Sequence, residues 1–171
     1  MKKQIPVKNI TFTAMFLALN IALSSFGIPV PGGHFYLNDV IICVAAILLN
    51  PFYAFIVGGI GSFLGDFFFY PVPMFVSLVT HGLQAMVISL FVHKFPAQKE
   101  LTGAMIGVVL GAIIMVVGYS LGRAFIYSTP EYALLKLPYQ ILQAGIGVTA
   151  SITLCYPAGL KKIYLHMFER S

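Results

Sequence analysis

Apolar residues are grouped along this chain in blocks, and each block ends at proline, glycine or a short polar stretch. The blocks cover residues 10–26, 39–49, 52–69, 74–92, 101–126 and 137–156. A helix needs about 20 apolar residues to cross a bilayer, which five of the blocks approach or exceed. The short second block crosses only if its helix is tilted or partly sunk. The pattern predicts an all-α membrane protein with six transmembrane helices.

The composition excludes soluble alternatives. Hydrophobic residues make up 59% of the chain and charged residues only 9%, and the mean hydropathy is +0.93. A soluble domain carries roughly 25% charged residues, so this chain has too little polar surface to face water on all sides. A soluble enzyme, a disordered tail and a disulfide-built secreted module are therefore excluded. We expect one integral membrane domain over residues 1–171.

The net charge of +5 does not indicate nucleic-acid binding, because the ten Lys and Arg residues lie in short clusters between apolar blocks. If the N-terminus is inside, all of them except Arg123 and Lys136 lie on the cytoplasmic side. Cytoplasmic loops are enriched in Lys and Arg, so we expect both termini in the cytoplasm. The outer connections are then residues 28–38, 70–73 and 127–138.

Small residues recur at helical spacing in three of the blocks. Ala14, Ala18 and Ala22 are each four residues apart and form one smooth stripe on the first helix. The glycine stripes consist of Gly61, Gly65, Gly103, Gly107, Gly111, Gly118 and Gly122. Such stripes let helices approach closely, most often inside a bundle. We expect most of them to be internal, and an external partner on the alanine stripe is the alternative.

Polar residues gather near the outer ends of the later helices, under the orientation above. They are Asp66, His81, Gln84, Tyr119, Arg123, Tyr139, Gln140 and Gln143. The first outer loop adds His34, Tyr36, Asn38 and Asp39 after two flexible glycines. A polar cluster ringed by Phe and Tyr at one end of an apolar bundle predicts a small-molecule pocket.

Each of these residues also has a simpler structural interpretation. A buried polar group usually forms a hydrogen bond with a neighbouring group of the protein. Asn38 or Asp39 is equally suited to cap the second helix. Asp66 is costly in hydrocarbon and is expected to bond a loop backbone, Arg123 or a ligand. Asp66 and His81 also suggest an alternative function class, a six-helix intramembrane enzyme that uses them as an acid–base pair.

Several motifs are absent from the sequence. There is no GxxxxGK[ST] loop, so we expect no ATP hydrolysis by this chain itself. There is no HExxH motif and no metal-ligand spacing, so no metal site is predicted. Cys43 and Cys155 lie inside apolar blocks, which indicates two small buried hydrophobes.

The order of three motifs resembles the S components of energy-coupling factor (ECF) vitamin transporters. The motifs are the alanine stripe, the loop Gly-Gly-x-x-x-x-Asn-Asp that ends at Asp39, and Gly-Gly-Ile-Gly-Ser-Phe-Leu-Gly-Asp that ends at Asp66 and is followed by Tyr70-Pro71. The resemblance covers the whole chain and is strongest to the riboflavin-type branch, which includes S components for hydroxymethylpyrimidine.

The resemblance implies a subunit of a prokaryotic plasma-membrane ABC importer, with no enzymatic activity of its own. Such a subunit captures a vitamin from outside and delivers it through a transmembrane coupling protein, the T component, and two cytoplasmic ATPases. ATP is then used by the partner subunits, and no cofactor is expected in this chain. The family's docking surface for the T component corresponds to Ala14, Ala18 and Ala22.

The resemblance also implies a ligand site at the outer side. It corresponds to Tyr36, Asn38, Asp39, His81, Gln84, Tyr119, Arg123, Tyr139 and Gln143. Because the chain has no Trp, a ligand ring would stack on Tyr or Phe. One candidate cation and several amides and phenols favour hydroxymethylpyrimidine or pyridoxine over the polyanionic folate. Riboflavin and pantothenate stay open.

Overall fold

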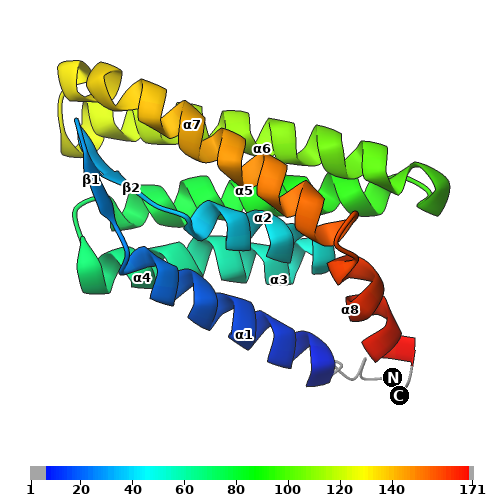
Figure 1. The fold of residues 1–171 in the computed structure, drawn as a ribbon. Coiled ribbons are helices and arrows are strands. Elements are labelled where there is room, and N and C mark those ends of the chain that lie inside the picture. The colour runs from blue at the N-terminus through cyan, green and yellow to red at the C-terminus, as the bar shows by residue number, and fades with distance from the viewer. Residues whose placement is uncertain (1–6, 170–171) are drawn as a thin grey trace.

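The computed structural model describes residues 7–169 and is built almost entirely of helices (Figure 1). In chain order the elements are α1 (Val7–Ser24), β1 (Ile28–Val30), β2 (Gly33–Phe35), α2 (Asn38–Leu48), α3 (Pro51–Phe55), α4 (Gly61–Phe69), α5 (Met74–Lys94), α6 (Glu100–Gly122), α7 (Pro130–Cys155) and α8 (Leu160–Glu169). Two π-helical segments, Ile56–Ile60 and Arg123–Tyr127, continue α3 into α4 and extend α6. A short 3₁₀ turn, Ala97–Lys99, precedes α6.

Four helical segments among the described residues are long and apolar enough to cross a membrane. They are Val7–Ser24, Pro51–Phe69, Met74–Lys94 and Glu100–Tyr127. Helices α7 and α8 meet the criterion together as a pair bent by 54°, whereas α2 is a shorter apolar helix. The prediction of an all-α membrane protein is confirmed. By length and composition the structure contains four to five candidate spans, fewer than the predicted six.

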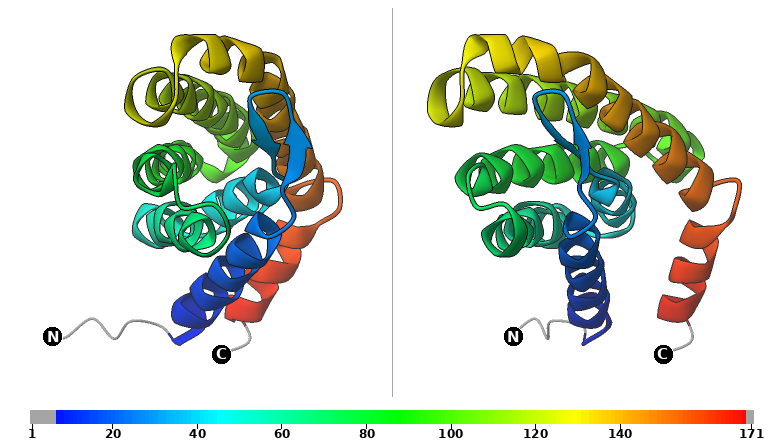
Figure 2. Two further views of the ribbon diagram at one scale, coloured as in Figure 1. Left: turned by 90° about the vertical axis from the view of Figure 1, so that its left-hand side faces the viewer. Right: turned by 60° about the vertical axis from the view of Figure 1, so that its left-hand side comes forward.

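The short helix α2 lies at the centre of the bundle, between α1, α5 and α7 (Figures 1 and 2). Ile42, Ala45 and Ile47 are completely buried, and α2 supplies seven of the 18 buried residues of the hydrophobic core cluster. A helix that is apolar on all sides is typically buried on all sides. The central position explains why the second block has no polar face.

An antiparallel hairpin, β1–β2, precedes α2, in the segment that the sequence suggested was a loop. Pro29 pairs with His34, and the turn requires glycine because Gly32 and Gly33 have φ of +80° and +149°. The hairpin lies at the end of the bundle where α4 passes to α5 and α6 to α7 (Figure 1). Helix α1 begins, and α8 ends, at the opposite end.

Helix α7 corrects the predicted boundary of the last span. It begins at Pro130 rather than near residue 137, so the predicted outer connection 127–138 shrinks to Ser128 and Thr129 between helical segments. Proline is favoured in the first turn of a helix but costs about 3 kcal/mol in its interior. Pro138 therefore suggested a helix start, yet it lies inside α7. Lys136, assigned to that connection, is in fact a buried helical residue.

The glycine stripes are internal, as expected. A Cβ at Gly107 would lie 3.0 Å from the Ile88 carbonyl oxygen of α5, and one at Gly61 would lie 2.6 Å from Asn20 Nδ2 of α1. Ala14, Ala18 and Ala22 are instead exposed. The buried residues of α1 are Thr13, Phe16, Asn20 and Ser24. The alanine stripe is therefore an outward face of the bundle.

Candidate functional site: a polar cavity beneath the hairpin

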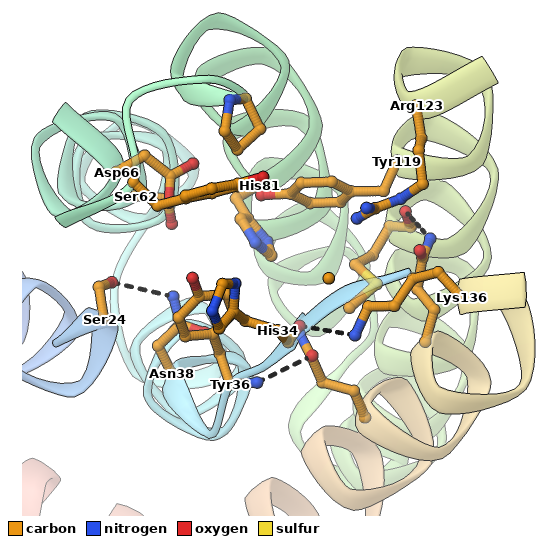
Figure 3. Close-up of a pocket in the computed structure, with 16 residues that line it drawn as sticks. Ser24, His34, Tyr36, Asn38, Ser62, Asp66, His81, Tyr119, Arg123 and Lys136 are labelled. Atoms are coloured by element: carbon orange, nitrogen blue, oxygen red, sulfur yellow. Dashed lines mark hydrogen bonds between the residues drawn. The ribbon is translucent and has the colours of Figure 1, made fainter. Parts of the chain in front are cut away.

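A cavity of about 40 Å³ lies between the hairpin and the ends of the surrounding helices (Figure 3). It is lined by Ser24, Gly33, His34, Tyr36, Asn38, Ser62, Asp66, Tyr70, Pro73, His81, Met115, Tyr119, Arg123, Lys136, Gln140 and Gln143. Most of these side chains are polar, although the bundle around them is apolar. The lining comes from α1, the hairpin, α2, α4, α5, α6 and α7 and from the segments between them. The site therefore exists only when the bundle is assembled.

Three side chains from the α6–α7 side hold the hairpin by its backbone. Arg123 donates to the carbonyl oxygen of Gly32, and Lys136 Nζ donates to that of His34 over 2.6 Å. Gln143 Oε1 accepts from the Tyr36 amide at 3.0 Å. Both cations of the cavity thus neutralise carbonyl dipoles of the hairpin, and within the described part of the chain neither forms an ion pair with a carboxylate.

Asp39 supports the cavity from behind its wall and is only 1% exposed. Gln84 Nε2 donates to Asp39 Oδ1 at 3.0 Å, and Gln143 Nε2 donates to Oδ2 at 2.6 Å. His81 Nδ1 lies 2.6 Å from Gln84 Oε1 and 3.8 Å from Asp39 Oδ1. A buried carboxylate is tolerated only when hydrogen bonds satisfy it. The two amides do this, and Gln84 at the same time fixes the ring of His81 at the cavity.

A second polar chain runs along the opposite wall. The Ser77 hydroxyl donates to Asp66, and Tyr119 Oη donates to Ser77 Oγ at 2.5 Å. Asp66 therefore bonds neither a loop backbone nor Arg123, as the sequence suggested, but a serine of α5. In Figure 3, Asp66 lies on one side of the cavity and Arg123 on the other. The cavity consequently has an acidic side and a basic side.

Buried amides and hydroxyls join α1 to the cavity. Asn20 Nδ2 donates to the Val57 carbonyl oxygen, which the π-helical segment presents, at 2.8 Å. Asn38 Nδ2 donates to Asn20 Oδ1 at 3.1 Å and to Ser24 Oγ at 3.3 Å. These bonds place Asn38 at the cavity wall and leave its own oxygen for another partner.

Several buried polar atoms at the cavity lack a hydrogen-bond partner among the described residues. They are His34 Nδ1, Asn38 Oδ1 and Arg123 Nε. More than 90% of buried polar groups in folded proteins are paired with protein or ordered water. A polar ligand in the cavity would supply the missing hydrogen-bond partners for these atoms.

Burial changes the acidity of Tyr36 in the loop that follows the hairpin. It raises the pKa of the Tyr36 hydroxyl to about 12, and the negative charge of Asp66 acts in the same direction. Tyr36 therefore keeps its proton at every physiological pH. It presents a neutral phenol to the cavity, which can both donate and accept a hydrogen bond.

A family model for the ECF-type riboflavin transporter, S component, matches residues 4–162. The chain belongs to this family. An uncharacterised protein of Pyrococcus woesei is similar to it, with 30% identity over 133 residues that cover 77% of this chain and 87% of the relative. As an S component, the chain is a vitamin-binding membrane subunit of a transporter that works with a T component and ATPases, and the family is a transporter component rather than an enzyme family.

The structure of this S component brings most of the predicted site residues together. Tyr36, Asn38, His81, Tyr119, Arg123 and Gln143 line the cavity. Asp39 and Gln84 lie behind them, and Tyr139 does not line the cavity although it is only one residue from Gln140. The predicted helix cap is wrong, because the residue that precedes α2 is Leu37, which makes no capping bond. Asn38 and Asp39 instead point inward from its first turn.

Sequence reasoning missed other members of the lining, chiefly Ser24, Ser62, Tyr70, Met115 and Lys136. No pattern in the sequence distinguishes Ser24 and Ser62 from other serines. Only the packing of α1 against α4 brings them to the cavity. Lys136 had a signal, because a lysine near an outer helix end is unusual, but the misplaced start of α7 assigned it to a solvated connection. A helix register that ran through Pro138 would have put Lys136, Gln140 and Gln143 on one face.

The alternative acid–base pair is not supported by the geometry. Asp66 and His81 both line the cavity, yet within the described residues no hydrogen bond joins them. Asp66 accepts from Ser77, and His81 is bonded to Gln84. Asp66 and His81 therefore belong to two separate hydrogen-bond networks. This arrangement favours a role in ligand binding over proton transfer between them.

Proposed function

We propose that this S component captures a small water-soluble vitamin or vitamin precursor in the cavity beneath the hairpin. It then delivers the ligand through the T component and two ATPases, which supply the ATP hydrolysis. The observation that carries the proposal is the set of buried atoms His34 Nδ1, Asn38 Oδ1 and Arg123 Nε, which lack a partner among the described residues and surround one cavity. A bound polar ligand removes the cost of leaving them without partners, about 1–3 kcal/mol each.

The proposed orientation places the hairpin end outside and both termini in the cytoplasm of a prokaryotic plasma membrane. The distribution of Lys and Arg supports it. Six crossings follow if the hairpin and α2 cross together as one segment. Helix α2 has 11 residues and a length of about 16 Å, half of the hydrocarbon core. Irregular backbone at membrane depth is tolerated where protein surrounds it, and in this segment β2 contacts α7 while α2 is buried in the bundle.

The cavity supports a ligand with one small ring. At about 40 Å³ it has room for only a few water molecules, so a larger ligand displaces more of the wall. Aromatic faces are available, because the rings of His34 and Tyr70 lie 5.3 Å apart and those of His81 and Tyr119 lie 5.1 Å apart. Acidic and basic sides suit a polar ring without net charge. We therefore prefer hydroxymethylpyrimidine or pyridoxine, with riboflavin or pantothenate next.

The exposed alanine stripe supports a docking role for α1. Ala14, Ala18 and Ala22 leave a flat outward face on a helix whose other face carries Asn20 and Ser24 toward the cavity. Small residues let a partner helix approach closely within a membrane. We propose that the T component packs on this face, so that docking and ligand binding use opposite sides of one helix.

The test is ligand binding to the purified chain in detergent, without ATPases or a T component. Riboflavin, hydroxymethylpyrimidine, pyridoxine, thiamin, pantothenate and folate are titrated by calorimetry. We expect tight binding of one vitamin and at least a tenfold loss in His34→Phe, which keeps an aromatic ring but removes the unpaired nitrogen. Tyr139→Phe, whose side chain lies outside the cavity, is the matched control. No binding across the panel, or equal losses in both variants, would contradict the proposal.

A further inference from the structure

Helix α8 lies across the end of the bundle that is opposite the hairpin (Figures 1 and 2). It turns away from α7 by 54° after Gly159, whose φ is +78°. Its 10 residues give a length of about 15 Å, too short to cross a bilayer alone. Helix α5 ends at Lys94 and α6 begins after Lys99 at the same end. Helix α8 is therefore at the level where the apolar spans meet the lipid headgroups.

Contacts with the bundle fix the inner face of α8. Tyr164 is 7% exposed, and its ring lies 4.9 Å from that of Phe12 in α1. Lys161 forms an ion pair with Glu100 at the start of α6. Tyr156 Oη donates to the same carboxylate at 3.2 Å. These contacts fix which side of α8 faces the bundle and which side faces outward.

The outward side chains of α8 divide into a basic row and apolar flanks. Lys162 and His166 are four residues apart and share one helical face. Ile163, 56% exposed, and Leu165, 48% exposed, lie on either side of that face. This arrangement is typical of helices that lie in the membrane interface, with apolar side chains toward the acyl chains and cations at the headgroups.

These residues border a groove of about 820 Å³ between α8 and the end of α7. Glu100 also lines it, but its carboxylate is already paired with Lys161. Among the described side chains no carboxylate forms an ion pair with Lys162 or His166. The groove therefore combines an apolar surface with a lysine and a histidine for which the described side chains supply no counter-charge, next to the headgroup layer.

We propose that this groove binds an anionic phospholipid. The lipid phosphate lies between Lys162 and His166, where the ammonium group and a ring N–H donate to its oxygens. The acyl chains cover Ile163 and Leu165. An anionic headgroup supplies the negative charge that the described side chains do not supply to Lys162. A zwitterionic headgroup also carries a positive charge, which would lie beside Lys162 and repel it. The site is distinct from the vitamin cavity and does not depend on the proposed substrate.

The experiment measures lipid retention on the purified full chain by native mass spectrometry. The chain is exchanged into detergent with equal amounts of phosphatidylglycerol and phosphatidylcholine. A cation near an anionic membrane surface contributes about fivefold in affinity, so we expect the wild type to retain phosphatidylglycerol at least fivefold over phosphatidylcholine. The double variant Lys162→Gln/His166→Gln should lose this preference. The control Lys94→Gln/Lys99→Gln, with two exposed cations outside the groove, should keep it.

Four outcomes overturn the proposal. They are an absence of preference in the wild type, an unchanged preference in the glutamine double variant, an equal loss in the control variant, and full displacement of the lipid by inorganic phosphate, which would show a simple anion site. If the glutamine double variant fails to fold, Lys162→Arg/His166→Arg decides the question. It places a guanidinium group at both positions and should preserve the preference for phosphatidylglycerol.

Discussion

Gln143 Nε2 donates a hydrogen bond of 2.6 Å to Asp39 Oδ2 and so joins two residues that are 104 positions apart in the chain. The other end of the same amide accepts from the Tyr36 backbone at 3.0 Å. One side chain of α7 therefore holds both the buried carboxylate of α2 and the segment that connects the hairpin to α2. The cavity wall and the hairpin are coupled through Gln143.

Replacement of Gln143 by leucine should disturb the stability and the binding site together. Gln143→Leu leaves the Tyr36 amide and one Asp39 oxygen without partners, and an unsatisfied buried group costs about 1–3 kcal/mol. We expect a lower free energy of unfolding by about 2 kcal/mol and at least a tenfold loss of vitamin affinity. Thermal unfolding in detergent and calorimetric titration measure these effects. An unchanged unfolding temperature would show that the bond carries no net energy.

The interior of this fold was largely predictable because burial in a membrane bundle leaves strong patterns. Five of the apolar blocks correspond to long helical segments, and the glycine stripes pack against neighbouring helices where their spacing indicated. Asn38 and Gln143 were predicted to share a pocket because polar groups at one depth in a bundle must satisfy one another or a ligand. Predictions of this kind need only the local composition of a segment and the depth of a residue in the membrane.

The parts that were missed depend on tertiary contacts. Pro138 carries a helix-breaking signal, yet the packing of α7 against α2 and α6 outweighs the lost hydrogen bond. The hairpin is only three residues per strand and is held by Arg123 and Lys136 from α6 and α7. No local sequence pattern reports such long-range bonds, so Lys136 was placed in solvent rather than at the cavity.

Lys136 should control the mobility of the hairpin. It is 3% exposed, and its ammonium group donates to the His34 carbonyl oxygen. Lys136→Met keeps the length and apolar stem of the side chain but removes this bond. We expect faster amide hydrogen exchange over residues 33–36, by about fivefold for a bond of about 1 kcal/mol. Lys162→Met, at the far end of the molecule, is the control and should leave these amides unchanged.

Two glycines in the transmembrane helices should respond to alanine in opposite directions. A Cβ at Gly107 would meet the Ile88 carbonyl oxygen at 3.0 Å, whereas one at Gly145 has no atom within 4 Å. Alanine is preferred over glycine within a helix by about 1 kcal/mol. Gly145→Ala should therefore raise the unfolding temperature, and Gly107→Ala should lower it by separating α5 from α6. The same sign for both variants would contradict the close approach of these helices.

The outward face of α1 allows docking to be separated from binding. Ala18 is exposed, while Asn20 two residues later is completely buried and supports the cavity through Asn38. Ala18→Trp adds bulk only on the outer side of the helix. If the T component packs on the alanine stripe, cells that carry this variant should lose at least tenfold of their vitamin uptake, because a close helix contact does not accommodate an indole ring. The purified variant should bind the vitamin with unchanged affinity.

Leu19→Trp is the matched control for this docking surface, because Leu19 is also exposed on α1 but is turned by about 100° around the helix axis from Ala18. It introduces the same side chain into the same helix, so general effects of an added indole on expression or membrane insertion are common to both variants. Uptake should persist in Leu19→Trp. Loss of uptake and ligand binding together in Ala18→Trp would assign the stripe to folding. Equal loss of uptake in both variants would mean that docking is not confined to the alanine stripe.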